Sequence, residues 1–235
     1  MEESIESVLN EIRERLLLIE SSLPKRVDAM AVSQTSKLPF KALLYREALI
    51  WRMAELGRVA FESFENDKLA SAILLTRAAV ETSAGLWYLC AKLDATVQSG
   101  AVGDIDDSLM KLMMGSKTNL DIMPQAINVL TFVDRVGKDI EGFHHQYDML
   151  SEFAHPNWAG TTLLYSKPDP PNVWTDFGAN IRAGDSTKHV GVLNLSVALG
   201  MFERSYNRIG ELMPAFITLC ESRLKTGEAG KAEEA

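Results

Sequence analysis

The chain has 235 residues, of which 46% are hydrophobic and 24% are charged, an ordinary balance for a globular protein. This composition supplies enough apolar side chains for a sizeable core and argues against disorder except at the chain ends. The formal net charge of −8 disfavours broad, sequence-independent binding to a nucleic-acid backbone, which requires a basic face.

Three helices are predicted in the first hundred residues. Residues 3–22 repeat apolar side chains every three or four positions between charges, a spacing typical of an amphipathic helix. A second helix is expected from about Leu38 to Asn66, with Pro39 in its first turn. A third helix, over residues 67–95, is apolar on nearly all sides, which predicts burial on several faces.

The middle of the chain is predicted to form shorter helices. One is expected near residues 107–115, another from Pro124 to Val136, and a third over residues 139–154. The last of these should end at His155, because Pro156 disfavours a helical backbone in the residue before it.

Residues 157–186 break the helical pattern. Two β-prone stretches, 161–166 and 173–177, flank a turn rich in proline and asparagine, which predicts a β-hairpin or a long ordered loop. Two interpretations are open for the aromatic side chains of Tyr165, Trp174 and Phe177: they cover a pocket, or they pack the hairpin onto the helices.

A last long helical region is expected from Ser186 or Thr187 to Lys225, with a kink or break at Pro214. Residues 226–235 are predicted to form a disordered tail. Residues 1–225 should therefore be one all-α domain. We expect an antiparallel bundle of long helices with a short β-hairpin or long-loop excursion near residues 160–186.

Targeting and redox features favour a cytoplasmic protein without a membrane segment. The first twelve residues are acidic and amphipathic, unlike a signal peptide. Near the C-terminus, the longest stretch without a charged side chain, His189–Phe202, is too short to span a bilayer. Cys90 and Cys220 both lie in apolar helical stretches, which favours two buried, reduced thiols over a disulfide.

The predicted helix over residues 139–154 concentrates groups able to bind a metal. On a helical projection its histidines and carboxylates fall on one stripe about 120° wide. A metal-dependent enzyme could use His144, His145, Asp148 and Glu152 from this stripe as ligands. The simpler interpretation, which the spacing favours, is the solvated face of an amphipathic helix. The sequence identifies no particular metal or other cofactor.

The third predicted helix places Arg77 and Glu81 one turn apart in an apolar sequence. Such a pair is costly to bury unless its partners are fixed. One interpretation is a structural ion pair that sets the packing register. The other is an anion-binding arginine held by Glu81 and facing His155, with Tyr147 and Ser151 completing the site.

The segments 77–81 (RAAVE) and 147–156 (YDMLSEFAHP) resemble those of uncharacterised bacterial helical proteins that are similar to the HEPN superfamily. The resemblance implies an all-α bundle, often dimeric, in a family whose active members cleave RNA and serve in defence or toxin systems. The catalytic pattern of those ribonucleases, an arginine followed a few residues later by a histidine, is matched by Arg182 and His189. Ala183 stands where a polar residue is usual.

These observations predict a protein that binds an anionic, nucleotide-like small molecule or a protein partner at a polar core site. A homodimer and a defence-related role are implied by the resemblance alone. Two alternatives stay open: a metal-dependent bundle enzyme that uses the residues of 141–155, and a HEPN-type ribonuclease. The sequence identifies no catalytic residue, and the acidic balance disfavours nucleic acid as a partner.

Overall fold

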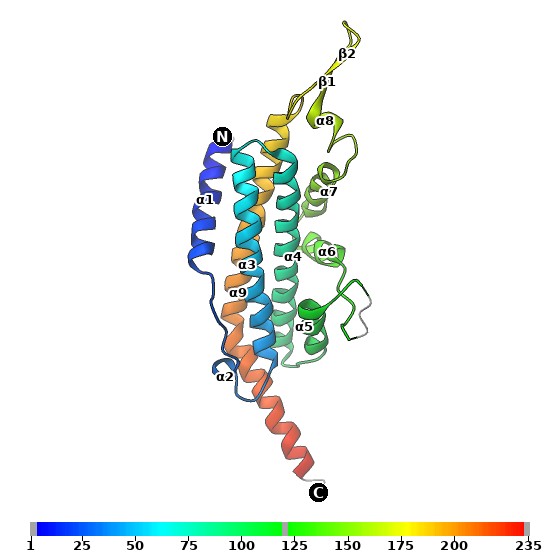
Figure 1. The fold of residues 1–235 in the computed structure, drawn as a ribbon. Coiled ribbons are helices and arrows are strands. Elements are labelled where there is room, and N and C mark those ends of the chain that lie inside the picture. The colour runs from blue at the N-terminus through cyan, green and yellow to red at the C-terminus, as the bar shows by residue number, and fades with distance from the viewer. Residues whose placement is uncertain (1–3, 119–121, 233–235) are drawn as a thin grey trace.

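The computed structural model describes residues 4–118 and 122–232 and shows a bundle of long helices with one small antiparallel sheet (Figure 1). The bundle consists of α1 (Ile5–Ser21), α3 (Leu38–Glu65), α4 (Leu69–Ser99) and α9 (Gly184–Ala232). The shorter elements are α2 (Ala29–Val32), α5 (Ile105–Met114), α6 (Val129–Asp139), α7 (Phe143–Ala154), α8 (Thr162–Tyr165), β1 (Ser166–Asp169) and β2 (Trp174–Phe177). The predicted all-α bundle with a small hairpin is confirmed.

Side-chain contacts define the direction of each long helix. Arg13 pairs with Glu65, and Arg58 pairs with Glu20, so α1 and α3 are antiparallel. In contrast, α4 and α9 run parallel, because Ser83 donates to the carbonyl oxygen of Ala198 at 2.7 Å and Asp94 pairs with Arg208 at 2.7 Å. The antiparallel neighbours are therefore α3 with each of α1, α4 and α9, whereas α4 and α9 share one direction (Figure 1).

The core lies where α9 packs against α3 and α4. Its largest fully buried side chains include Phe61, Phe64, Ile73, Leu86, Leu89 and Phe202. Gly191 lets α9 approach closely, because a Cβ atom there would lie 2.5 Å from the Phe64 ring and 2.6 Å from the Ile73 side chain. The burial of α4 on several sides agrees with its nearly uniform apolar sequence.

Two predicted boundaries in the middle of the chain were wrong. Residues 124–128 are not helical, because Ser116 and Gln125 form an isolated β-bridge, and α6 begins only after Asn128 caps its first turn. Residues 162–165, predicted as part of a β-hairpin or a long ordered loop, form the helical turn α8, which is closed by hydrogen bonds to the carbonyl oxygen of Thr161. Local hydrogen bonding thus outweighs the β-propensity of this segment.

The last helix is longer than predicted. It begins at Gly184 and continues through Pro214 without a break, and buried side chains on both sides of the proline, Met213 and Phe216, hold it against the bundle. Residues 226–232, for which we predicted a disordered tail, continue the helical backbone, and residues 233–235 lie outside the described part of the chain. No helix among the described residues is long and apolar enough to cross a membrane.

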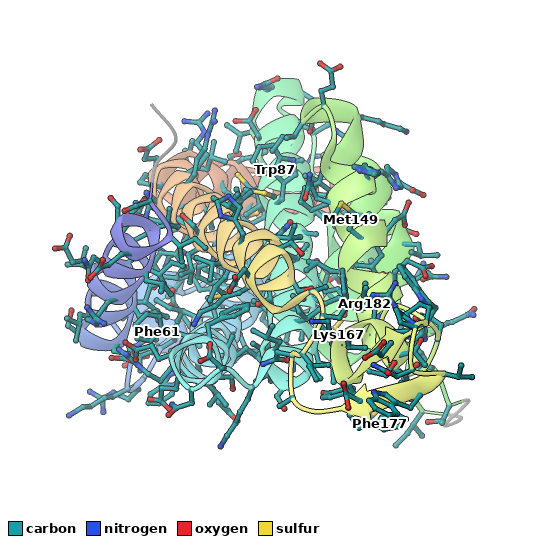
Figure 2. The ribbon with its side chains drawn as sticks, turned by 90° about the horizontal axis from the view of Figure 1, so that it is seen from above. Phe61, Trp87, Met149, Lys167, Phe177 and Arg182 are labelled. Carbon is teal, nitrogen blue, oxygen red and sulfur yellow. The ribbon has the colours of Figure 1, made fainter. Side chains whose placement is uncertain are left out.

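The hairpin of β1 and β2 projects past the end of the bundle (Figure 1). Tyr165, Trp174 and Phe177 are exposed, the last at 79%, and Phe177 lies at the outer edge of the molecule (Figure 2). Of the two interpretations left open by the sequence, the one in which these aromatic side chains pack the hairpin onto the helices was therefore wrong. A hairpin without such contacts is held to the protein mainly by its own backbone ladder and by the adjoining chain.

Candidate functional site

Three of the predicted site residues meet where α7 packs on α4. Arg77 Nη2 donates to Tyr147 Oη at 2.9 Å, and Tyr147 Oη donates to Glu81 Oε1, also at 2.9 Å. Arg77 Nε lies 3.4 Å from Glu81 Oε1, and the guanidinium carbon lies 5.2 Å from the centre of the Tyr147 ring. We call Arg77, Glu81 and Tyr147 the α4–α7 cluster.

Helical spacing explains how this cluster forms. Arg77 and Glu81 are one turn apart and therefore share a face of α4. On α7, the buried residues Phe143, Tyr147 and Leu150 form the apolar stripe that packs against α4. Gly142, whose φ of 80° is rarely adopted by residues with side chains, turns the chain into α7.

The hydroxyl group of Tyr147 is held in its protonated form. Burial raises the pKa of Tyr147, and the hydrogen bond to Glu81 raises it further, against a lowering effect of Arg77. At neutral pH the phenol is therefore a hydrogen-bond donor to Glu81 and an acceptor from Arg77. The buried Nε atom of Arg77 has no hydrogen-bond partner, so the cluster leaves one donor unsatisfied.

Ser151 and His155 do not complete this cluster. Ser151 Oγ donates to the backbone carbonyl of Tyr147 at 2.9 Å, a bond within α7. His155 caps the end of α7 in an extended conformation, as predicted, and its side chain is exposed. It lies eight residues beyond Tyr147, a rise of roughly 12 Å along a helix. No contact between Arg77 and His155 occurs among the described residues, so their predicted meeting gains no support.

The metal-site hypothesis also gains no support from the geometry. His144 Nε2 lies 2.9 Å from Asp134 Oδ1 on α6, and His145, Asp148 and Glu152 are exposed. Among the side chains that the structure describes, those of residues 4–118 and 122–223, no three from histidine, cysteine, aspartate or glutamate are placed to hold a metal ion. This arrangement fits the solvated-face interpretation of the stripe.

A pocket of about 400 Å³ opens beside the α4–α7 cluster, between α4, the start of α7 and α9. We call it the α4–α7–α9 groove. Tyr147 is the member of the cluster that lines it. Most of the lining is apolar and comes from Val80, Phe143, Leu193, Val197, Ala198 and Met201. Leu193 and Val197 are 40% and 53% exposed, so an apolar rim continues from the groove onto the surface.

A few polar groups also line the groove. Asn194 Nδ2 donates to Gln146 Oε1 at 3.1 Å and to the carbonyl oxygen of Val190 at 2.9 Å, which fixes α9 against α7. Glu141 is the only charged residue among those that line the groove. The lining is therefore suited to an apolar molecule with a small polar end rather than to an anion.

A second cluster of the same three residue types was missed by the sequence analysis. Arg46 and Glu47 of α3 form a largely buried ion pair, and Tyr206 Oη of α9 donates to Glu47 Oε2 at 2.6 Å. We call these residues the α3–α9 cluster. The Arg46 side chain is only 13% exposed, although arginine usually lies on the surface. The signal for burial was the apolar sequence around Arg46 and Glu47.

The ribonuclease-like pair is not joined in the structure. The Arg182 guanidinium carbon lies 5.9 Å from the centre of the Trp158 ring, and His189 is exposed near the start of α9. Among the described contacts, none connects these two side chains. The sequence spacing of Arg182 and His189 therefore does not produce a shared site in this conformation.

Comparisons of the chain with protein-family models, with curated proteins and with solved structures found no significant match. The resemblance to HEPN proteins consequently stays a prediction. The site must be interpreted from its own geometry.

Proposed function

We propose that this protein binds an uncharged, largely apolar small molecule in the α4–α7–α9 groove. The observation that carries the proposal is a groove of about 400 Å³ with a mostly apolar lining and a few polar groups. Its volume falls within the range of small-molecule sites, and such sites combine an apolar body with a small number of polar groups that fix orientation.

The charge of the lining favours a neutral ligand over the anion predicted from the sequence. Arg77 does not line the groove, and Glu141 would repel an anionic group. The first turn of α7 begins at Gly142, which provides no side chain to cap its N–H groups. A carbonyl or hydroxyl oxygen of the ligand is the group best suited to accept hydrogen bonds from these N–H groups.

The α4–α7 cluster supports the groove by positioning one of its walls. Tyr147 lines the groove with its ring, while its hydroxyl group is held between Arg77 and Glu81. A wall fixed by two hydrogen bonds stays in place when the groove is empty, which reduces the entropy lost on binding. On this proposal Arg77 and Glu81 are positioning residues.

The neutral dye N-phenyl-1-naphthylamine tests the proposal, because it fluoresces strongly only in apolar surroundings. The wild-type protein should bind it saturably. The Val197→Lys variant, which places a charge on the exposed rim, should bind it about tenfold more weakly. The matched control is Leu44→Lys, which changes a residue 40% exposed on α3, a helix that does not line the groove.

A second dye separates a neutral from an anionic ligand. 1-Anilinonaphthalene-8-sulfonate has the same ring system with an added sulfonate, and we expect it to bind more weakly than the neutral dye. Tighter binding of the sulfonate, or equal binding of the neutral dye by Val197→Lys and wild type, would contradict the proposal. A signal lost only in Trp174→Ser would instead assign binding to the exposed hairpin.

A further inference from the structure

A second pocket, of about 550 Å³, lies farther along the seam between α4 and α9. It shares no lining residue with the α4–α7–α9 groove. Trp87, Cys90 and Ala91 form its apolar side, and Arg204 and Ser205 lie opposite on α9. We call it the Trp87 pocket. Figure 2 shows Trp87 on the side of the molecule away from the hairpin residue Phe177.

Two opposite charges in this pocket lack an ionic partner among the described contacts. Arg208 is neutralised, since it pairs with Asp94 at 2.7 Å and with Glu211 at 3.1 Å. The Arg204 guanidinium carbon, by contrast, lies 6.0 Å from the centre of the Trp87 ring and pairs with no described carboxylate. Asp139 accepts a hydrogen bond from Trp87 Nε1 at 3.0 Å and pairs with no described cation.

These two charges lie against the same indole without pairing with each other. A molecule placed beside the Trp87 ring could therefore contact both. A ligand that carries both a negative and a positive group could meet each of them with a charge-assisted hydrogen bond, which is about 2.8 Å long. An α-amino acid carries both groups: its carboxylate would face Arg204 and its ammonium group would face Asp139.

Ser205 adds an unused hydrogen-bonding group. Its side chain is 2% exposed, and its hydroxyl oxygen has no hydrogen-bond partner. On the facing helix, Thr82, Ser83 and Thr96 each donate to the carbonyl oxygen four residues earlier, whereas the buried hydroxyl group of Thr76 also lacks a partner. A buried hydroxyl without a partner is costly, and a ligand carboxylate beside it would accept a hydrogen bond from it.

Cys90 contributes an apolar surface rather than a nucleophile. Burial raises the pKa of Cys90 to about 11, so the thiol stays protonated at neutral pH. The apolar surface of Cys90, Ala91 and Trp87 would contact an aliphatic or aromatic ligand side chain. The pocket therefore has the groups for non-covalent binding.

We infer that the Trp87 pocket binds a zwitterionic α-amino acid with an apolar side chain. A simple anion would meet Asp139 without a counter-charge, and a simple cation would meet Arg204. A zwitterion satisfies both charges and leaves its side chain against Trp87. The inference does not depend on the proposed function, because the two pockets use different residues.

Isothermal titration with the twenty common amino acids tests the inference. L-Phenylalanine should bind, and its single-charge analogues phenethylamine and 3-phenylpropionate should each bind at least about tenfold more weakly. Arg204→Gln and Asp139→Asn should each lower the affinity for L-phenylalanine about tenfold. The amide that replaces the carboxylate in Asp139→Asn retains an oxygen acceptor for Trp87, so this variant removes the charge and keeps the indole hydrogen bond.

Arg135→Gln and Asp148→Asn are matched controls, since both remove an exposed charge outside the pocket, and they should bind as wild type does. Val197→Lys should also bind the amino acid normally, which separates this site from the groove. The inference is overturned if no amino acid binds at concentrations up to about 10 mM. Equal binding of the single-charge analogues, or normal binding by Arg204→Gln and Asp139→Asn, would overturn it as well.

Discussion

The α3–α9 and α4–α7 clusters contain the same residue types in different surroundings. In the α3–α9 cluster the Arg46 and Glu47 side chains are only 13% and 12% exposed. The Arg46 guanidinium carbon lies 3.4 Å from the centre of the Tyr206 ring, and its Nε donates to the Tyr206 carbonyl oxygen. In the α4–α7 cluster, Arg77 and Glu81 are 27% and 26% exposed.

Hydrogen bonding separates the two clusters further. The Nε atom of Arg46 has a backbone acceptor, whereas the Nε atom of Arg77 has none. A closed cluster at the α3–α9 interface is suited to fixing the bundle. The more open cluster holds a tyrosine that also lines a groove. Residue composition alone therefore does not distinguish a structural cluster from one that supports a binding site; burial and the neighbouring cavity do.

The largest expected difference between the two clusters is in the stability lost when the carboxylate of each is removed. Glu47→Ala leaves Arg46 buried without a counter-charge and should lower the free energy of unfolding by about 3–5 kcal/mol. Glu81→Ala affects a better solvated pair and should cost about 1 kcal/mol or less. Urea denaturation of both variants measures this difference. Equal losses would show that the two clusters do not differ in their structural importance.

Removing the tyrosine hydroxyl group of each cluster should give a smaller difference in stability. Tyr206→Phe removes the donor to Glu47 and should cost about 2 kcal/mol, as expected for a buried hydrogen bond to a charged group. Tyr147→Phe should cost about 1 kcal/mol and should also weaken binding of N-phenyl-1-naphthylamine. Titration of both variants with the dye, at equal folded fraction, measures the effect on binding. Weaker binding by Tyr206→Phe alone would mean that the α3–α9 cluster, and not the α4–α7 cluster, supports the groove.

Alkaline pH should weaken the α3–α9 cluster. Burial raises the pKa of Tyr206 above its ordinary value of 10.0, and the hydrogen bond to Glu47 raises it further. The folded protein therefore holds this proton more tightly than the unfolded chain does. The stabilising contribution is complete below pH 10 and is lost as the pH rises above it.

Urea denaturation between pH 8 and pH 11 measures this effect as a decline in the free energy of unfolding. Tyr206→Phe should decline less steeply than wild type. Tyr45, whose pKa burial raises to about 12, contributes to the remaining decline in both proteins. Identical pH profiles for wild type and Tyr206→Phe would contradict the account of this tyrosine.

The smallest effect is expected on the hairpin. Phe177 is 79% exposed, so Phe177→Ser should change the free energy of unfolding by no more than about 0.5 kcal/mol. Thermal denaturation of Phe177→Ser and Glu47→Ala in parallel compares the smallest and the largest expected losses of stability. A large loss of stability would mean that the hairpin packs against the bundle, in contrast to its exposed position (Figure 1).

Part of this arrangement could be predicted from the sequence. The apolar circumference of residues 69–93 predicted the burial of α4, and Pro156 predicted the end of α7 at His155. The pairing of Arg77 with Glu81 followed from their helical spacing. Each of these features depends on residues close together in the chain.

The features that were missed depend on distant residues. Tyr206 lies 159 residues from Glu47, so their hydrogen bond has no local signal. The groove requires the relative placement of α4, α7 and α9, which periodicity does not specify. The predicted approach of Arg77 to His155 stays a prediction for the same reason: helical spacing gives the face of each residue but not its partner on another helix.

The most direct test of the central claim is methyl NMR of the wild-type protein during titration with N-phenyl-1-naphthylamine. Our account predicts saturable shift changes concentrated on the methyl groups of Val80, Leu193, Val197 and Met201, which line the groove. Shift changes that are absent from these four residues and occur elsewhere in the protein would contradict it.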